Sequence, residues 1–395
     1  MIKISLVVSD LSSSGAGRWG GAVRPFLLSQ ALKKIGYEVE IVGFVDEEDQ
    51  TLSISQTQVP IVAIASPKYY PQFFRSAQKL LEKITGDIIY AYKLKPTSFG
   101  LSLLKKVQTH KPVLLDIDDW ELSWHGGENW KYRSTFKQFA RDLFKPEGAF
   151  RQPDHPFYLK LIERWVSQAD RVTLHNQFLQ KRFGGVYLPN GKDIDLFDPV
   201  HYNPEVSRER FGLSDYQVLM FPGAPRPYKG VEDVLMALDL LNKPDLRLVI
   251  VGGSPYDDYD SQLMEKWGRW IIKMPKYSAL EMPEVVSAAH IIVVPQRDTP
   301  AAQAQFPLKL TDGMAMAKPI LATTVGDIPE ILGDTGYLVE PSSPEQQAES
   351  IEYILENYEA ASEQGLRSRQ RCVEKYSITT MANILSELIT EILKK

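Results

Sequence analysis

The chain has 395 residues, 44% of them hydrophobic and 24% charged, and its formal net charge is −5 at neutral pH. This composition excludes a globally disordered chain, and the acidic balance disfavours a nucleic-acid-binding protein. The length favours two domains, and the single cysteine, Cys372, excludes an internal disulfide and a cysteine-based zinc site.

The N-terminal part of the chain alternates short β-branched segments with helical patterns. Residues 24–36 predict a helix that ends at Gly36. The strand candidates are short and apolar, as strands buried on both faces are. They are residues 3–10, 39–44, 87–92, 112–118 and 170–176. Such alternation predicts a parallel sheet with helices on both faces, and hence an N-terminal Rossmann-like domain over residues 1–190.

Residues 121–164 break this alternation, and we interpret them as an insertion that contains some helix. The segment 131–145 (KYRSTFKQFARDLFK) carries five basic side chains against one acidic one, with aromatic and aliphatic residues at helical spacing. A helix of this kind can lie on anionic lipid headgroups, or it can cover the core of the first domain with its charges in water. Residues 67–84 are a second aromatic and basic stretch, and three nearby tryptophans could stack on a sugar or belong to the core. They are Trp120, Trp124 and Trp130.

After a turn-rich linker at residues 186–199, the alternation of strands and helices begins again. Helices are expected near 230–241 and 261–270 and from Asp312 onward, and the tail from Ser343 is helical. The expected strands are residues 217–223, 246–253, 290–296, 319–324 and 336–340. This predicts a second doubly wound domain over residues 191–375, followed by a C-terminal helical segment, 376–395.

The first ten residues indicate a strand, because their apolar run is too short for a signal peptide. No apolar run in the chain approaches the length of a membrane span. We therefore expect a cytoplasmic protein, with a peripheral contact at the inner face of the membrane as an open alternative.

Ligands of open α/β sheets bind beyond the carboxyl ends of the strands, so the loops at those ends are the candidate sites. The loop after the first strand carries Gly20 and Gly21 just ahead of a helix, an arrangement that suits an anion or is simply a flexible turn. It lacks the dinucleotide glycine spacing, which disfavours a nicotinamide cofactor. In the second domain, FPGAPRPYKG (221–230) offers Arg226 and Lys229, which suit a diphosphate or are two solvated charges.

The segment FPLKLTD (306–312) is a third candidate site. We place Asp312 at the start of a helix, where its carboxylate can accept hydrogen bonds from the two hydroxyls of a ribose or can simply cap the helix. Lys309 and the backbone before it can hold phosphate oxygens.

A run of carboxylates follows the strand at 112–118. Asp116, Asp118 and Asp119 stand at its end, and His125 comes slightly later. These groups could orient an acceptor hydroxyl or accept its proton, could cap a turn, or could chelate magnesium. The sequence leaves these three interpretations open.

Four segments of this chain, in this order, resemble the family four glycosyltransferases, which are retaining enzymes with the GT-B fold. They are GGAVRPFLLSQALKKIGYEVEIV, PNGKDIDLFDP, PGAPRPYKGVEDVLMAL and LTDGMAMAKPILATTVGDIPEIL. The resemblance covers most of the chain and implies two Rossmann-like domains that face a cleft. The first would bind the acceptor, the second would bind the nucleotide sugar, and the last helix, about residues 378–393, would cross back onto the first.

The resemblance also implies roles for single residues. Gly20 and Gly21 would lie against the donor diphosphate or the transferred sugar, Arg226 and Lys229 would clamp the diphosphate, and Asp312 would bind the ribose. The loop over the phosphates and sugar would consist of Phe306, Pro307, Leu308 and Lys309. On the acceptor side, the candidates for a catalytic role are Asp118, Asp119 and His125.

The chain departs from the family pattern at two positions. Ala304 stands where the family has the first glutamate of its motif, so the sugar contact of that carboxylate is missing, and Gln303 or Gln305 is a candidate substitute. Ala224 stands where the family has an arginine directly after a glycine, with Arg226 two residues further on.

The resemblance thus implies a retaining hexosyltransferase of polysaccharide biosynthesis. It would move a sugar from a nucleotide diphosphate sugar, its co-substrate, to a glycan, lipid-linked or small-molecule acceptor. No bound cofactor or metal is expected, because GT-B enzymes generally neutralise the leaving diphosphate with protein cations. Two alternatives stay open: a sugar-nucleotide epimerase or hydrolase of the same fold, and a scaffold that binds nucleotide sugar without turnover, which Ala304 suggests.

Overall fold

The computed structural model describes residues 1–12, 23–46, 59–67, 69–253 and 257–394. Its contacts divide the chain into two compact units, which we call unit 1 (residues 1–191 and 378–395) and unit 2 (residues 192–377). The chain therefore passes from unit 1 to unit 2 after Gly191 and returns after Ser377. The sequence places these two boundaries after residues 190 and 375.

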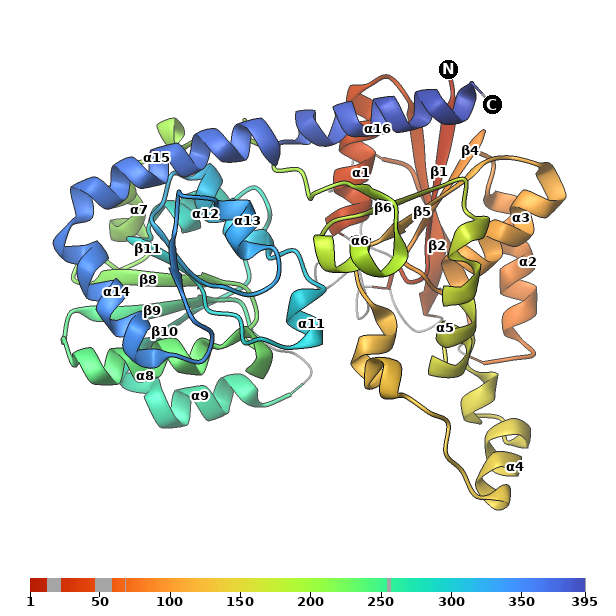
Figure 1. The fold of residues 1–395 in the computed structure, drawn as a ribbon, viewed down its shortest axis with the longest axis horizontal. Helices are drawn as coiled ribbons and strands as arrows, with labels where there is room; N and C mark the ends of the chain where they lie inside the picture. The colour runs from red at the N-terminus through yellow and green to blue at the C-terminus, as the bar shows by residue number, and fades with distance from the viewer. Residues whose placement is uncertain (13–22, 47–58, 68, 254–256, 395) are drawn as a thin grey trace. The chain divides into compact units, whose positions relative to one another are not determined.

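Unit 1 is built on a parallel sheet (Figure 1). Its strands in the described residues follow the order β3-β2-β1-β4-β5-β6-β7. Their bounds are β1 Lys3–Val8, β2 Glu38–Asp46, β3 Ile61–Ser66, β4 Ile88–Tyr92, β5 Val113–Ile117, β6 Arg171–Leu174 and β7 Val186–Tyr187. The strand order reverses direction between β1 and β4, which makes the carboxyl ends of this pair the switch point of the sheet.

Unit 1 also contains helices, most of which pack on the faces of this sheet. Their bounds are α1 Val23–Lys34, α2 Phe73–Lys83, α3 Leu101–Thr109, α4 Phe136–Phe144, α5 Pro156–Ile162, α6 Gln177–Phe183 and α16 Ile378–Leu393. The C-terminal helix α16 lies beside α1 (Figure 1). Met381, Leu385 and Ile389, spaced four residues apart, are fully buried on the face that α16 turns to this core. The hydrophobic effect therefore holds the last helix on unit 1.

Unit 2 repeats the design with a parallel sheet in the order β10-β9-β8-β11-β12-β13. The bounds of its strands are β8 Gln217–Pro222, β9 Leu246–Val251, β10 Ile271–Met274, β11 Ile291–Val294, β12 Ile320–Thr323 and β13 Tyr337–Val339. The switch point lies between β8 and β11, so the loops after these two strands open at the same place on the sheet edge.

The helices of unit 2 follow its strands. Their bounds are α7 Pro204–Arg210, α8 Val231–Leu241, α9 Tyr259–Trp267, α10 Met282–Ser287, α11 Pro300–Gln303, α12 Leu308–Ala315, α13 Ile328–Leu332, α14 Pro344–Glu356 and α15 Tyr358–Lys375. Small residues let α12 approach the sheet closely, because a Cβ added to Gly313 would lie 3.0 Å from the side chain of Ile292 on β11.

Most of the expected elements are present, and three corrections follow. The helix expected to start at Asp312 begins at Leu308, so Asp312 lies in its second turn and does not cap it. Strands β3, β7 and β10 were not expected from the sequence. The insertion contains α4, but this helix does not cover the core, because Asp142 is its buried residue and its phenylalanines are exposed.

No helix in the described ranges combines the length and the apolar character that crossing a membrane requires.

Candidate functional site

At two positions, the loop after β8 has a backbone conformation that only glycine adopts easily. Gly223 has φ 141° and Gly230 has φ 68°, and a Cβ on Gly230 would lie 1.8 Å from the carbonyl oxygen of Pro295. A short 3-10 turn, Pro227–Lys229, lies between these glycines, and the Arg297 amide donates to the carbonyl of Tyr228 at 2.9 Å. The loop after β8 is thereby fixed against the loop after β11 at the switch point.

Three cationic side chains converge at this switch point. Lys309, in the first turn of α12, is buried, with its ammonium 4.6 Å from the centroid of the Phe221 ring. Its Cε lies 3.9 Å from the position of a Cβ on Gly223, which places it against the loop after β8. Lys229 Nζ donates to the carbonyl of Ala224 at 2.8 Å, and Arg226 belongs to the same loop.

The pKa values of Lys229 and Lys309 are both lowered at this site. Burial, together with the charges of Lys309 and Arg226, holds the pKa of Lys229 well below its usual value. Burial lowers the pKa of Lys309 to about 8, although the carboxylate of Asp312 acts in the opposite direction. Like charges held together away from water destabilise one another, and a bound anion would relieve that cost. The arrangement therefore favours a polyanionic ligand.

Two carboxylates near the cations were not assigned partners from the sequence. Arg226 Nη1 lies 2.8 Å from Oδ2 of Asp257, which follows β9. Asp312 forms an ion pair with Lys192, whose ammonium also lies 3.7 Å from the centroid of the Phe197 ring. The carboxylate of Asp312 is thus oriented by a cation 120 positions earlier in the chain.

The segment before α12 contacts the loop after β8 through Gln305 and Tyr228. Phe306 and Pro307 are buried, and no side chain caps the N-terminus of α12 at Leu308, so its backbone N–H groups have no side-chain partner there. Ala304 is fully buried. Of its two neighbours, Gln305 donates its amide to the Tyr228 hydroxyl at 3.2 Å, whereas Gln303 donates to Asp298.

In unit 1, the carboxylate of Asp116 near the end of β5 has a different environment from those of Asp118 and Asp119. Asp116 is fully buried and accepts two hydrogen bonds from the Arg24 guanidinium, at 2.6 and 2.7 Å. Thr173 donates a third, at 2.7 Å. Asp116 therefore ties β5 to α1 and β6, and its oxygens are committed to that structural role.

Asp118 and Asp119 belong to a charged cluster with two lysines. Asp118 accepts a hydrogen bond from the Tyr92 hydroxyl and lies 3.5 Å from Lys93 Nζ. Glu121 accepts from Lys93 at 2.8 Å and lies 3.1 Å from Lys95. Because burial favours the neutral acid, the pKa of Asp118 is raised and that of Asp119 rises to about 7.

Asp119 has one engaged oxygen and one available oxygen. Its Oδ2 accepts from the indole N–H of Trp124 at 2.8 Å, while its buried Oδ1 has no hydrogen-bond partner among the described residues. His125 ends a short 3-10 turn, Glu121–His125, and is exposed overall. The part of its ring that is buried lowers its pKa. Of the nearby tryptophans, Trp120 is buried and donates to Glu163, whereas Trp124 is exposed. No cluster of three or more metal-ligating side chains occurs among the described residues.

The structure therefore groups the predicted donor residues of unit 2 and, separately, the predicted acceptor residues of unit 1. Gly20 and Gly21 lie outside the described residues. Lys93 and Glu121 were missed, although Lys93 stands at the end of β4 with a φ of 73°, unusual for a residue other than glycine. Lys192 and Asp257 were also missed, because neither adjoins a strand end in the predicted sheet.

Comparisons with known proteins agree with this architecture. Residues 216–357 match the family model described as glycosyl transferases group 1. A GDP-mannose-dependent α-(1-6)-phosphatidylinositol monomannoside mannosyltransferase from Mycolicibacterium smegmatis is 26% identical over 58% of this chain, and the match spans 64% of that relative. A D-inositol 3-phosphate glycosyltransferase from the same organism is 23% identical over 91% of this chain and 84% of its own length.

Solved structures share the fold. A glycosyltransferase from Rickettsia africae aligns with a TM-score of 0.74 and 19% identity, over 100% of this chain and 99% of that one. Anabaena HepE in complex with UDP-glucose aligns with a TM-score of 0.75 and 15% identity, over 99% of this chain and 100% of that one. The two parallel-sheet units and these neighbours define a GT-B-fold protein. The family match over residues 216–357 and the two relatives make this chain similar to the group 1 glycosyltransferases, which are enzymes of the transferase class.

Proposed function

We propose that this enzyme is a retaining glycosyltransferase whose unit 2 binds a nucleotide diphosphate sugar and whose unit 1 binds the acceptor. The observation that carries the proposal is the group of three buried or half-buried cations at the β8/β11 switch point, Arg226, Lys229 and Lys309. A diphosphate is the ligand that best compensates such a group.

The residues of unit 2 take up the charge that develops when the glycosidic bond to the diphosphate breaks. Lys229, Lys309 and the uncapped N-terminus of α12 would stabilise the departing diphosphate, which leaves with the electron pair of that bond. Arg226 would turn from Asp257 to the phosphates. Asp312, oriented by Lys192, would accept hydrogen bonds from the ribose.

The sugar itself would be held without the carboxylate that Ala304 replaces. Gln305 is the better substitute of the two glutamines, because its hydrogen bond to Tyr228 ties it to the loop that carries the cations. The acceptor oxygen would attack the anomeric carbon on the face that the diphosphate leaves, and its proton would pass to the departing phosphate. In unit 1, the available oxygen of Asp119 would orient the acceptor hydroxyl.

Relatives support a donor and an acceptor of these general kinds. HepE has been solved with UDP-glucose, and the named relatives use GDP-mannose or act on inositol 3-phosphate or a phosphatidylinositol glycolipid. For this chain, two experiments test the base and sugar of the donor and the stereochemistry of the transfer. Calorimetry with UDP, GDP, ADP and their glucose and mannose conjugates identifies the donor, and NMR of the product gives its anomeric configuration.

The proposed reaction has a defined expected outcome. One nucleotide sugar binds, transfers its sugar only when an acceptor is present, and gives a product with the donor's anomeric configuration. Free sugar or an epimer formed without acceptor would favour the hydrolase or epimerase alternative. Nucleotide binding without turnover, with activity appearing in Ala304→Glu, would favour the scaffold alternative.

We also propose that α4 holds the enzyme on an anionic membrane surface. Phe136 and Phe144 are 88% and 76% exposed on this helix, and Phe139 and Leu143 are also exposed. The exposed basic side chains around them are Lys131, Arg133, Lys137, Arg141 and Lys145. Exposed aromatic rings beside cations complement the acyl boundary and the anionic headgroups of a bilayer.

A further inference from the structure

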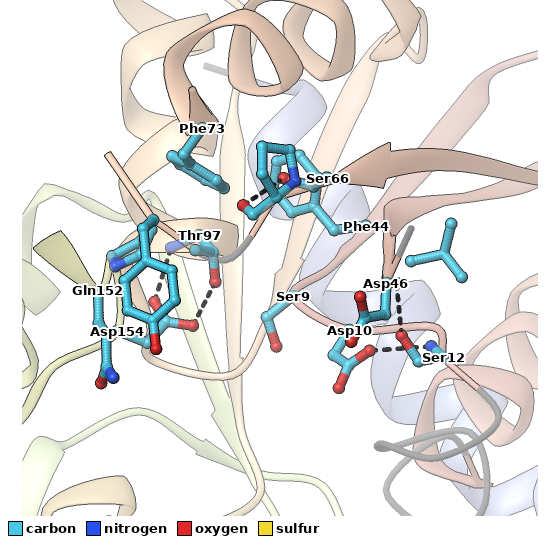
Figure 2. A pocket seen from close by; sticks show the side chains of 14 residues that line it. Ser9, Asp10, Ser12, Phe44, Asp46, Ser66, Phe73, Thr97, Gln152 and Asp154 are labelled. Atoms are coloured by element: carbon cyan, nitrogen blue, oxygen red, sulfur yellow. Dashed lines mark hydrogen bonds between the residues drawn. The ribbon is translucent and has the colours of Figure 1, made fainter. Parts of the chain in front are cut away.

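Each unit contains a pocket, and these two pockets lie at opposite ends of their sheets. In unit 1, Ser9, Asp10 and Asp46 stand in the wall of a pocket at the carboxyl ends of β1 and β2, the end where open α/β sheets bind substrates (Figure 2). In unit 2, a pocket of about 330 Å³ lies at the amino ends of β8 and β11, beside Gln217 and His290. We call it the amino-end pocket. Because β8 is six residues long, about 20 Å of strand separates Gln217 from the loop that carries the predicted donor cations.

Arg208 and Lys318 bring positive charge to the surroundings of the amino-end pocket. Arg208, on α7, lines it, and its Nη1 lies 3.5 Å from the carbonyl oxygen of Ala288. Lys318 precedes β12, the strand next to β11, so it stands at the same edge of the sheet. Lys318 is only 6% exposed, and within the described part of the chain its ammonium has neither a hydrogen bond nor an ion pair.

The electrostatic effects of these two cations place them close to His290. Burial lowers the pKa of Lys318 to about 7, and the charge of Arg208 acts in the same direction. Burial, followed by the charges of Arg208 and Lys318, lowers the pKa of His290 to about 4. An anion bound among these groups would stabilise the ammonium of Lys318 and relieve the repulsion between the two cations.

Two carboxylates also line the amino-end pocket, but they belong to its outer rim. The side chains of Glu205 and Asp215 are exposed. Neither carboxylate counteracts the lowered pKa of Lys318 or His290, as a carboxylate close to them would. Positive charge therefore dominates the inner part of the pocket, and negative charge is confined to the rim.

Neutral polar groups complete the amino-end pocket. His290 accepts the Val218 backbone N–H at its Nδ1, at 2.9 Å, so the neutral imidazole carries its hydrogen on Nε2 and can donate it. The Ser214 hydroxyl and the Gln217 amide belong to the same lining. Phosphate oxygens accept hydrogen bonds from guanidinium, ammonium, imidazole and hydroxyl donors, whereas the hydroxyls of a sugar donate to carboxylates.

We propose that the amino-end pocket binds the phosphate group of a phosphorylated sugar, with the phosphate at Arg208 and Lys318 and the sugar hydroxyls at the rim carboxylates. This site is separate from the predicted donor site, because its residues stand at the opposite edge of the same sheet. It goes beyond the proposed function, and binding at this pocket does not depend on how the donor site is assigned.

The test measures binding to the full-length protein by calorimetry, with glucose 6-phosphate, inorganic phosphate and methyl α-glucoside as probes. Glucose 6-phosphate is expected to bind at least tenfold more tightly than inorganic phosphate, because only the sugar reaches the rim. Methyl α-glucoside is not expected to bind. If inorganic phosphate binds as tightly as glucose 6-phosphate, the ligand is free phosphate and the sugar part of the proposal is wrong. If neither phosphate binds, the whole proposal is wrong.

Variants on one helix locate the phosphate. Arg208→Gln is expected to weaken the binding of glucose 6-phosphate at least tenfold. Arg210→Gln is the matched control, because Arg210 lies on the same helix but is 57% exposed and paired with Glu284 outside the pocket lining. It should leave the affinity unchanged. Equal effects of the two variants, or none from Arg208→Gln, would place the phosphate elsewhere and refute the assignment.

Lys318→Met tests the buried cation and its folding cost together. This variant removes an unpaired buried charge, so without phosphate its thermal midpoint should equal or exceed that of the unsubstituted protein. Its affinity for glucose 6-phosphate should fall at least tenfold. A folded Lys318→Met protein that binds glucose 6-phosphate normally would remove Lys318 from the site.

Lys229→Met separates the amino-end pocket from the predicted donor site. This variant should keep its affinity for glucose 6-phosphate, and Arg208→Gln should bind a nucleoside diphosphate as the unsubstituted protein does. Loss of glucose 6-phosphate binding in Lys229→Met would assign that phosphate to the donor site and overturn the proposal. If no nucleoside diphosphate binds the unsubstituted protein, the proposed function fails, whereas the phosphate site is judged by Arg208→Gln alone.

Discussion

Buried lysines in the two units have opposite electrostatic environments. In unit 2, burial and neighbouring cations lower the pKa of Lys229, and burial lowers that of Lys309. In unit 1, burial alone would lower the pKa of Lys93 and Lys95, but the carboxylates beside them raise both. The charges of Lys93 and Lys95 are therefore balanced by carboxylates within the protein, whereas a bound anion would stabilise the charged forms of Lys229 and Lys309.

The strongest way to break this comparison is to remove a cation from unit 2. Lys229→Met keeps the length of the side chain and removes its charge. A charge-assisted hydrogen bond is worth about 1.5–3 kcal/mol, so the affinity for the nucleoside diphosphate should fall about 10- to 100-fold in calorimetry. Arg226→Ala should weaken binding in the same direction.

Lys243→Met is the matched control for Lys229→Met. Lys243 also belongs to unit 2, but its side chain is 40% exposed and is paired with Glu352. Lys243→Met should therefore leave nucleotide affinity unchanged. Unchanged affinity in both Lys229→Met and Arg226→Ala would show that the diphosphate does not bind at the switch point.

A second prediction sharpens the comparison through pH. Lys309 in the free protein has a pKa of about 8, and a bound diphosphate would raise it by favouring the ammonium. Below pH 8 the lysine is already charged and its contribution to affinity is constant. Above pH 8 binding requires proton uptake, so affinity should fall by about tenfold per pH unit for one linked proton.

The measurement is calorimetry between pH 7 and 10 in buffers with different ionisation enthalpies, which reports the protons taken up. Lys309→Met should lower affinity at pH 7 and remove about one proton from the uptake at higher pH. A flat profile up to pH 10 in the unsubstituted protein would mean that Lys309 does not face the phosphates.

The contrast between the charged groups of the two units also explains how far the sequence could predict these sites. The sequence pointed to Arg226 and Lys229 because cations beside glycines at the end of a parallel strand suit an anion, and to Lys309 because a helix was expected to begin just after it. The ion pair of Lys192 with Asp312 joins residues 120 positions apart, so no local pattern indicates it. Likewise, Asp116 resembles its neighbours in sequence, and only the buried Arg24 shows that its role is structural.

The fold was predicted best where strands are central and buried. β1, β4, β5, β8 and β11 carry continuous apolar runs, and each is buried over most of its length. The missed strands are all edge strands, and their residues are partly exposed. Edge position weakens the apolar signal on which prediction depends. The start of α12 was misplaced because Asp312 has the chemistry of a cap without the position of one.

A third prediction tests the balanced charges of unit 1. Burial raises the pKa of Asp119 to about 7, so its carboxylate form increases as pH rises through 7. If the available oxygen orients the acceptor hydroxyl, the KM for acceptor should decrease as pH rises from 6 to 8. Asp119→Asn should remove that dependence and raise the acceptor KM about tenfold at pH 8, with nucleotide affinity unchanged.

One further variant, Glu121→Gln, controls for a purely structural effect. Glu121→Gln disturbs the same cluster through Lys93 and Lys95 without removing the proposed contact, so its pH profile should keep the step near pH 7 or shift it. If Asp119→Asn keeps the step, another group titrates there and Asp119 does not contact the acceptor.

The smallest expected effect concerns the surfaces of the two units. Phe136 on α4 and Leu280 in unit 2 are 88% and 73% exposed, but only Phe136 lies among the exposed basic side chains of residues 131–145. Partial burial of one phenylalanine in a bilayer is worth about 1 kcal/mol, so Phe136→Ser should weaken binding to phosphatidylglycerol-containing vesicles about fivefold in co-sedimentation. Leu280→Ser should bind as the unsubstituted protein does.

Because the proposed contact also needs anionic headgroups, binding should be lost on neutral phosphatidylcholine vesicles and weaken with salt. Equal binding to neutral and anionic vesicles, or equal loss in both variants, would remove α4 as the membrane contact and leave its exposed rings without an assigned ligand.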